Sequence, residues 1–185
     1  PGMDPAKPIT FQSATGDPTS VNLTFAPFNI NMNFTVRLNG ACNLIFQNLT
    51  LSSTGADFSR VVETGHMANN NQFIGNRIIG PIVTTSYDYK VLFYSYWYND
   101  NDYLIENNYF YGGSYGLYLQ NDGSSNYEQG YVIQNNSFIE QNYVGIYGYR
   151  QEGTQIIGNI IHSTSINSSY GGIWLYSCIN QLRIL

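Results

Sequence analysis

Apolar and polar residues alternate over short stretches of this chain, with the period of a β-strand that buries one side. The clearest stretches are 116–120, 145–149 and 172–176, where apolar residues and aromatic residues take alternate positions. These stretches are rich in β-branched and aromatic residues, and clusters of Asn, Ser and Gly separate them. The pattern therefore predicts an all-β chain.

A second kind of segment recurs between those strands, as an apolar residue, two variable positions, Asn, one variable position and another apolar residue. Its copies are 46–51, where Leu49 replaces the Asn, 73–78, 105–110, 133–138 and 156–161. The spacing is irregular but always that of one short coil. Strands that recur once or twice per coil without intervening helices favour a parallel β-solenoid, whose neighbouring coils lie about 4.8 Å apart.

These repeats resemble the right-handed parallel β-helix repeat of pectin-lyase-like proteins, over about residues 34–185. Residues 1–33 are similar to the entry coils of large secreted or surface-attached bacterial members. The resemblance implies a single right-handed parallel β-helix domain of about six coils, secreted or at the cell surface. The apolar, strand-like end of the sequence also suggests a fragment of a longer chain. Because the family includes lyases, hydrolases, epimerases, adhesins and stalks, it does not fix the function.

Size and charge exclude some functions. A chain of 185 residues is the size of one domain. Its net charge is −5, with only 10% charged residues, which disfavours nucleic acid as a partner. No apolar run approaches the roughly 18 residues that span a membrane. Seventeen Tyr and 23 Asn take the place of charged residues.

The solenoid register assigns structural roles to two sets of residues. Stacked amides at one corner of successive coils would hydrogen-bond along the axis. Cys42 and Cys178 would follow equivalent strands about five coils apart, roughly 24 Å, which is too far for a disulfide. The amide positions are Asn76, Asn108, Asn136 and Asn159.

The same register predicts an aromatic stripe. If Leu117, Ile146 and Ile173 point inward, their neighbours point outward, because side chains alternate along a strand. We expect the outward rings to form a flat platform for the apolar faces of sugars, and hence non-catalytic polysaccharide binding. The alternative is a ladder that only stabilises the strands of a stalk or adhesin spacer. The predicted carbohydrate-binding residues are Tyr94, Tyr96, Tyr118, Gln120, Tyr147, Tyr149, Trp174 and Tyr176.

Catalysis is a further alternative, as a polysaccharide lyase or a glycosidase, both of which need suitably placed carboxylates. The best cluster in the sequence is Asp122 with Arg150 and Glu152, at the ends of adjacent outward strands; a solvated ion pair is the simpler interpretation.

Metal sites have weaker signals. A calcium site is conceivable at Asp88, Asp100 and Asp102. His66 and His162 have no companions at zinc-ligand spacing, and we expect no other cofactor.

The end of the chain predicts self-association. The last segment would expose a strand edge and the apolar residues Leu182, Ile184 and Leu185. Because uncapped solenoid ends offer unpaired backbone groups, we expect end-to-end association.

Overall fold

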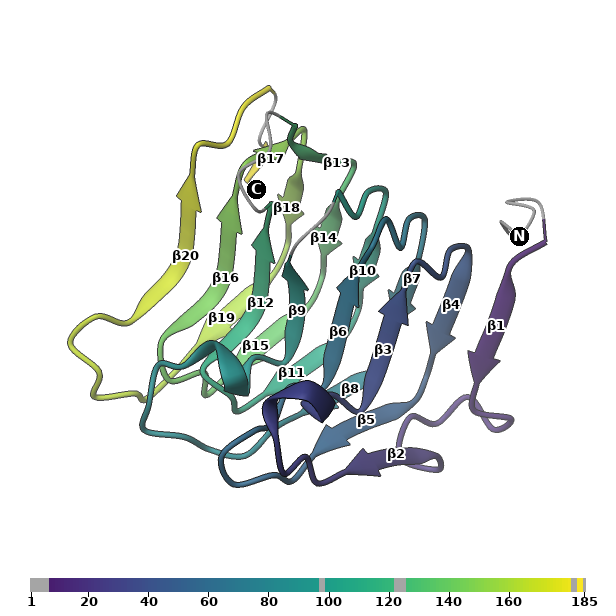
Figure 1. Ribbon diagram of the computed structural model, residues 1–185, viewed down its shortest axis with the longest axis horizontal. Coiled ribbons are helices and arrows are strands. Elements are labelled where there is room, and N and C mark those ends of the chain that lie inside the picture. Colours follow the sequence, from purple (N-terminus) through teal and green to yellow (C-terminus); the bar gives the residue numbers. More distant parts are fainter. Residues whose placement is uncertain (1–6, 97–98, 122–125, 181–182, 185) are drawn as a thin grey trace.

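The computed structural model describes residues 7–96, 99–121, 126–180 and 183–184. Its strands wind into a parallel solenoid of six complete coils and the start of a seventh (Figure 1). Each complete coil adds one strand to each of three sheets, and all the strand pairs are parallel. The predicted all-β parallel solenoid of about six coils is confirmed.

Sheet 1 contains β1 (Ile9–Gln12), β4 (Leu44–Gln47), β7 (Gln72–Ile74), β10 (Leu104–Glu106), β14 (Val132–Gln134), β18 (Gln155–Ile157) and β21 (Arg183–Ile184). Sheet 2 contains β2 (Asn22–Phe25), β5 (Thr50–Ser53), β8 (Arg77–Ile79), β11 (Tyr109–Tyr111), β15 (Ser137–Ile139) and β19 (Ile160–His162). Sheet 3 contains β3 (Val36–Asn39), β6 (Val62–Gly65), β9 (Phe93–Tyr96), β12 (Tyr115–Gln120), β16 (Val144–Tyr149) and β20 (Gly171–Tyr176). A small fourth sheet pairs β13 (Glu128–Gln129) with β17 (Gln151–Glu152), and two 3-10 turns are η1 (Ile30–Met32) and η2 (Asp88–Lys90).

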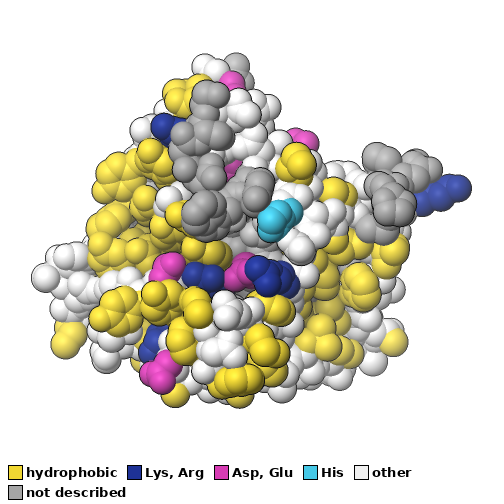
Figure 2. All heavy atoms as spheres, in the orientation of Figure 1, with side chains coloured by type: hydrophobic (Ala, Val, Ile, Leu, Met, Phe, Trp, Pro, Cys, Tyr) yellow, Lys and Arg dark blue, Asp and Glu magenta, His cyan; other side chains and the backbone are white. Residues whose placement is uncertain are grey.

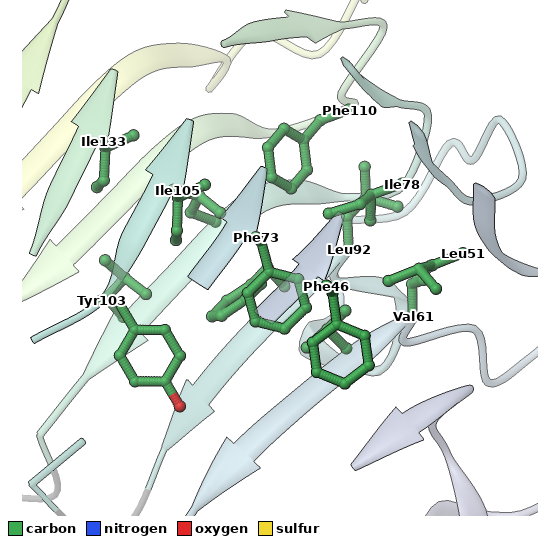
Figure 3. Close-up of a cluster of buried hydrophobic side chains, with 14 of the residues drawn as sticks. Phe46, Leu51, Val61, Phe73, Ile78, Leu92, Tyr103, Ile105, Phe110 and Ile133 are labelled. Carbon is green, nitrogen blue, oxygen red and sulfur yellow. The ribbon is translucent and has the colours of Figure 1, made fainter. Parts of the chain in front are cut away.

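The core consists of ladders of like residues inside the coils. In sheet 1 the rings of Phe11, Phe46 and Phe73 stack in successive coils, with centroids 5.1 and 5.0 Å apart. In sheet 2, Phe110 and Phe138 stack at 4.7 Å. Figure 3 shows Phe46, Phe73 and Phe110 pointing into the space between the sheets. Each fully buried side chain of this size contributes about 1.5–3 kcal/mol.

The predicted amide ladder is present at the corner between sheets 1 and 2. The backbone N–H of Asn76 donates to Oδ1 of Asn108 in the next coil (2.8 Å), and Asn108 donates in the same way to Asn136 (2.9 Å). Each side-chain amide also donates to a strand carbonyl, as Nδ2 of Asn108 does to Phe73 O (2.8 Å). The asparagines therefore satisfy backbone groups that the bend leaves unpaired.

Both cysteines, Cys42 and Cys178, are free thiols, as the register predicts. Over the ranges that the structure describes, no helix has the length and apolar character needed to cross a membrane.

Candidate functional site

The outer side of sheet 3 carries two rows of outward side chains that run along the solenoid axis. In the register of sheet 3, Glu63 lies beside Tyr94, Tyr94 beside Tyr118, and Tyr118 beside Tyr147. The first row is Arg37, Glu63, Tyr94, Tyr118, Tyr147 and Trp174, and the second row is Tyr96, Gln120, Tyr149 and Tyr176. All eight predicted carbohydrate-binding residues lie in these rows.

The tyrosines of the first row stack face to face. Tyr94 and Tyr118 have ring centroids 5.3 Å apart and planes 25° apart, and Tyr118 and Tyr147 have values of 4.7 Å and 18°. Two rings lying flat on the sheet, edge against edge, would clash at these centroid distances. The rings are therefore stacked, with their faces turned towards the next coil along the solenoid axis. The ring edges therefore point outward, while the hydroxyl group of Tyr118 donates to Oε1 of Gln120 in the second row (2.5 Å). This differs from the flat platform expected from the sequence.

Other aromatic side chains cover the beginning of the strands. Tyr115 packs edge-on against Tyr118 (5.1 Å), and Tyr143 packs edge-on against Trp174 (5.0 Å). With Val91, Val144 and the first-row rings they form a second apolar cluster, separate from the core inside the coils. Burial raises the pKa of the Tyr118 phenol well above its usual value, so its hydroxyl stays protonated and remains a hydrogen-bond donor.

Two loops flank this cluster. The loop 80–92, which contains η2, precedes β9, and the loop 163–170 precedes β20 (Figure 1). Nδ2 of Asn167 donates to the hydroxyl of Ser86 (2.9 Å), which ties the two loops together. The hydroxyl of Ser114 donates to the carbonyl of Tyr87 (2.6 Å) and holds the first loop against β12. The loops thus form a wall at one side of the aromatic rows.

A charged cluster continues the first row towards the N-terminal coils. The guanidinium of Arg60 donates to Glu63 Oε2 (2.9 Å), to Asp88 Oδ2 (3.1 Å) and to the backbone carbonyl of Asp88 (2.9 Å). Nε of Arg37 lies 2.9 Å from Glu63 Oε1. Arg60 also lies 3.6 Å from the ring centroid of Tyr94, which is only 7% exposed. One buried arginine therefore joins two strands and η2 through four contacts.

The charged cluster and part of the aromatic rows line a cavity of about 690 Å³ on the outer side of sheet 3, which we call the groove. In Figure 2, acidic and basic side chains alternate in a line on this face, beside a group of hydrophobic side chains. The groove is lined by the charged cluster, by η1 and η2, and by Tyr94, Tyr96, Tyr118 and Gln120. It combines ring edges, amides, carboxylates and guanidinium groups, a mixture suited to a polar ligand with apolar parts.

Comparison with protein families identifies the architecture. Residues 96–182 match a family model described as "Right handed beta helix region". The chain folds as a right-handed parallel β-helix. The earlier coils of this β-helix pair with the matched ones in the same three sheets, so they continue a single solenoid. The predicted resemblance is thereby confirmed at the level of the right-handed β-helix. Comparison with curated proteins and with solved structures gives no significant match.

Of the predicted catalytic residues that the structure describes, neither Arg150 nor Glu152 lines the groove. Asp122 lies outside the described residues. Arg150 lies 5.5 Å from the ring of Tyr149, at the end of β16. The carboxylate of Glu152 accepts hydrogen bonds from Gln129 Nε2 (2.8 Å) and Asn180 Nδ2 (2.7 Å), on the small fourth sheet. The carboxylates that do reach the groove are those of Glu63 and Asp88.

The three acidic residues considered for calcium do not form one site. Asp88 is paired with Arg60, Asp100 is buried inside the coils and accepts from the backbone N–H of Ala68 (2.9 Å), and Asp102 lies beside Gly130. Within the described part of the chain, no group of three or more His, Cys, Asp or Glu is arranged to hold a metal ion.

Sequence reasoning missed Arg37, Arg60 and Glu63. A signal was present, because segments 35–38 and 60–64 share the strand alternation of 91–96. Aligning them places Arg37 and Glu63 in line with Tyr94, as the register shows. The contact of Arg60 with Asp88 had no such signal, since η2 lies in a loop of irregular sequence.

Proposed function

We propose that this β-helix binds a polysaccharide without cleaving it, along the outer side of sheet 3. The observation that carries the proposal is the groove, where hydrogen-bonding groups of both kinds lie beside aromatic rings on one face. Sugars present hydroxyl groups and C–H surfaces in close alternation. Binding sites for such ligands combine apolar walls with a few placed polar groups.

The proposed contacts are with ring edges and hydroxyls rather than with ring faces. A phenol both donates and accepts a hydrogen bond, as a sugar hydroxyl does. The guanidinium of Arg37, which is 44% exposed, and the amide of Gln120 add further polar groups at the groove. The first row spans six strands, or roughly 24 Å at the usual strand spacing, which suits a chain-like ligand that lies along the axis.

The charged cluster favours binding over glycoside hydrolysis. A glycosidase needs one carboxyl group protonated, as the general acid, beside one that is ionised. Here Arg60 donates hydrogen bonds to both Glu63 and Asp88, so both carboxylates are held in ion pairs with one guanidinium. Neither carboxylate has the apolar surroundings of a general acid.

A purely structural role is the second candidate, and one observation favours it. The faces of Tyr94, Tyr118 and Tyr147 are occupied by one another, as in a ladder that stabilises neighbouring strands. In that case the β-helix is a stalk or spacer, and the groove has no ligand.

We also propose that the ends of the solenoid associate, and that the chain works outside the cell, where such polysaccharides are found. Strands β1, β2 and β3 are edge strands at one end, and β19, β20 and β21 at the other. Phe11 at the first end is 47% exposed, and Ile160 at the second is 62% exposed. Unpaired parallel edges with apolar residues support this proposal.

The test of polysaccharide binding is a glycan array followed by affinity electrophoresis with the glycans that bind. Tyr96→Ala with Tyr118→Ala, which removes two rings that line the groove, should weaken binding by about tenfold or more, and Arg37→Ala should weaken it further. The matched control is Tyr109→Ala with Tyr111→Ala, a stacked outward pair on sheet 2, which should bind like the wild type.

Binding that is lost equally in both double variants would contradict the site. An array without binding would favour the stalk. Unsaturated or reducing ends released from pectin, alginate or xylan would show an enzyme instead.

A further inference from the structure

Two acidic side chains are buried inside the coils directly behind the groove. Asp100 follows β9, Glu128 lies on β13, and both are fully buried. The ion pairs of the described residues all involve Arg37 or Arg60, so neither buried carboxyl group takes part in one of them. Two buried negative charges without a cation are costly.

A single hydroxyl group lies between the two carboxyl groups. Oγ of Ser95, on β9, lies 3.2 Å from Asp100 Oδ2 and 3.1 Å from Glu128 Oε1. A serine has one hydroxyl hydrogen, so it donates to only one of them at a time. The other oxygen of each carboxyl group has its own donor, namely the N–H of Ala68 (2.9 Å) for Asp100 and Nε2 of Gln151 (2.7 Å) for Glu128.

One additional proton gives a hydrogen bond to both of the carboxyl oxygens that face Ser95. If Glu128 is protonated, it donates to Ser95 Oγ, and Ser95 donates to Asp100. With both carboxylates ionised, each keeps its other donors, which for Glu128 include the backbone N–H of Asp100. One of the two carboxylate oxygens at Ser95 would then face the lone pairs of the hydroxyl, next to a second anion. Burial raises the pKa of Glu128, and the charge of Asp100 raises it further. The other titratable groups that interact electrostatically with the pair are His66, Tyr103 and Tyr131.

We propose that Asp100, Ser95 and Glu128 hold one proton between them, and that its release as the pH rises loosens this corner of the solenoid. The cluster joins three coils, through β9, β13 and β17. Ser95 also lies between Tyr94 and Tyr96, whose side chains line the groove. A pH effect on ligand binding would rest on the proposed function, whereas the effect on stability does not.

The direction of the pH dependence follows from the raised pKa. Burial raises the pKa of Glu128 from its ordinary 4.5 to about 8. Between these two values the folded state holds a proton that the unfolded state has lost. The contribution of this group to stability is therefore full below about pH 4.5 and is lost as the pH rises towards about 8.

The test is urea unfolding of the wild type and of Glu128→Gln from about pH 5 to about pH 9. Glutamine resembles the protonated acid in shape and keeps an N–H donor for Ser95. We expect the wild-type midpoint to fall with rising pH, and the fall to shrink by at least half in Glu128→Gln. Glu106→Gln, which alters an outward carboxylate bonded to Gln134, is the matched control and should keep the wild-type dependence.

Equal pH dependence in Glu128→Gln and the wild type would overturn the proposal. A second measurement needs no variant: carboxyl ¹³C NMR of the wild type should show one glutamate that titrates well above its ordinary range. If every glutamate titrates near the ordinary value of about 4.3, no proton is shared. Neither measurement uses a glycan. Their results therefore test the shared proton independently of the proposed polysaccharide binding.

Discussion

At the scale of the residue, the asparagines of the ladder are the clearest case of sequence dictating structure; they are Asn76, Asn108, Asn136 and Asn159. One side chain supplies both an acceptor and a donor where the backbone bends, and each is used in the same way in successive coils. Within the ladder a hydrophobic side chain would leave buried backbone groups unpaired. Leu49 takes the equivalent position one coil before Asn76, at the start of the ladder, where its own N–H donates to Asn76 Oδ1.

Asn108→Ala should therefore destabilise the protein strongly. The change leaves the N–H of Asn76 without its acceptor and the carbonyl of Phe73 without its donor, and each buried unpaired group costs about 1–3 kcal/mol. Urea unfolding measures the loss. Asn31→Ala, at an exposed position, should leave the midpoint almost unchanged. If both variants lowered the midpoint equally, the asparagine ladder would not stabilise the protein more than an exposed asparagine does.

The sequence predicted which side chains point outward, but not how their rings are oriented. Alternation placed Tyr118 and Tyr147 outward, because it depends only on the strand period. It left open the rotation of the rings, which packing against Tyr115 and against each other decides. Glu128 was missed because it follows an Asn-, Ser- and Gly-rich cluster that is typical of a loop.

At the scale of the element, a column of glycines sets how closely β12, β16 and β20 approach one another. A Cβ at Gly145 would lie 2.7 Å from the carbonyl oxygen of Gly172, and a Cβ at Gly116 would lie 2.5 Å from that of Gly145. The atoms met are backbone, which cannot turn aside. The small residue is thus required by the spacing of the coils.

Gly145→Ala should spread the coils locally and destabilise the domain by about 1–3 kcal/mol, the usual cost of overpacking. Differential scanning calorimetry would show the lower Tm. The control is Thr19→Ala, at an exposed position of a turn, which should leave the Tm almost unchanged. Gly16→Ala in the same turn would not serve, because the positive φ of Gly16 strains any side chain placed there. A wild-type Tm for Gly145→Ala would contradict the close approach of these strands.

The elements also show why the charged cluster escaped sequence analysis. Arg37 and Glu63 sit on strands whose register was predictable, but Asp88 is brought to Arg60 by η2 in an irregular loop. Strand periodicity carries no information on where such a loop returns. Predictions from the repeat were therefore reliable within the coils and failed between them.

At the scale of the whole molecule, each of the three sheets ends in an edge strand at both ends of the solenoid, among the described residues. All these strands run in the same direction, so an edge at one end could pair in parallel with an edge at the other. We expect larger species at high protein concentration in light scattering. Ile160→Lys places a charge on the edge strand β19 and should reduce association, because charged side chains on an edge oppose strand pairing.

The control for this effect is Ile82→Lys, at an exposed residue of the loop 80–92, which should associate like the wild type. A monomer at every concentration would contradict end-to-end association. Equal behaviour of the two lysine variants would show that the association does not use the strand edge.

The central claim is that the outer side of sheet 3 binds a polysaccharide, and hydrogen exchange followed by mass spectrometry tests it most directly. With a glycan selected on the array, we expect slower exchange in peptides from the six strands of sheet 3, namely β3, β6, β9, β12, β16 and β20, and in the loop 80–92, and unchanged exchange in sheet 2. Protection confined to sheet 2 or to the solenoid ends would place the ligand elsewhere and contradict the account.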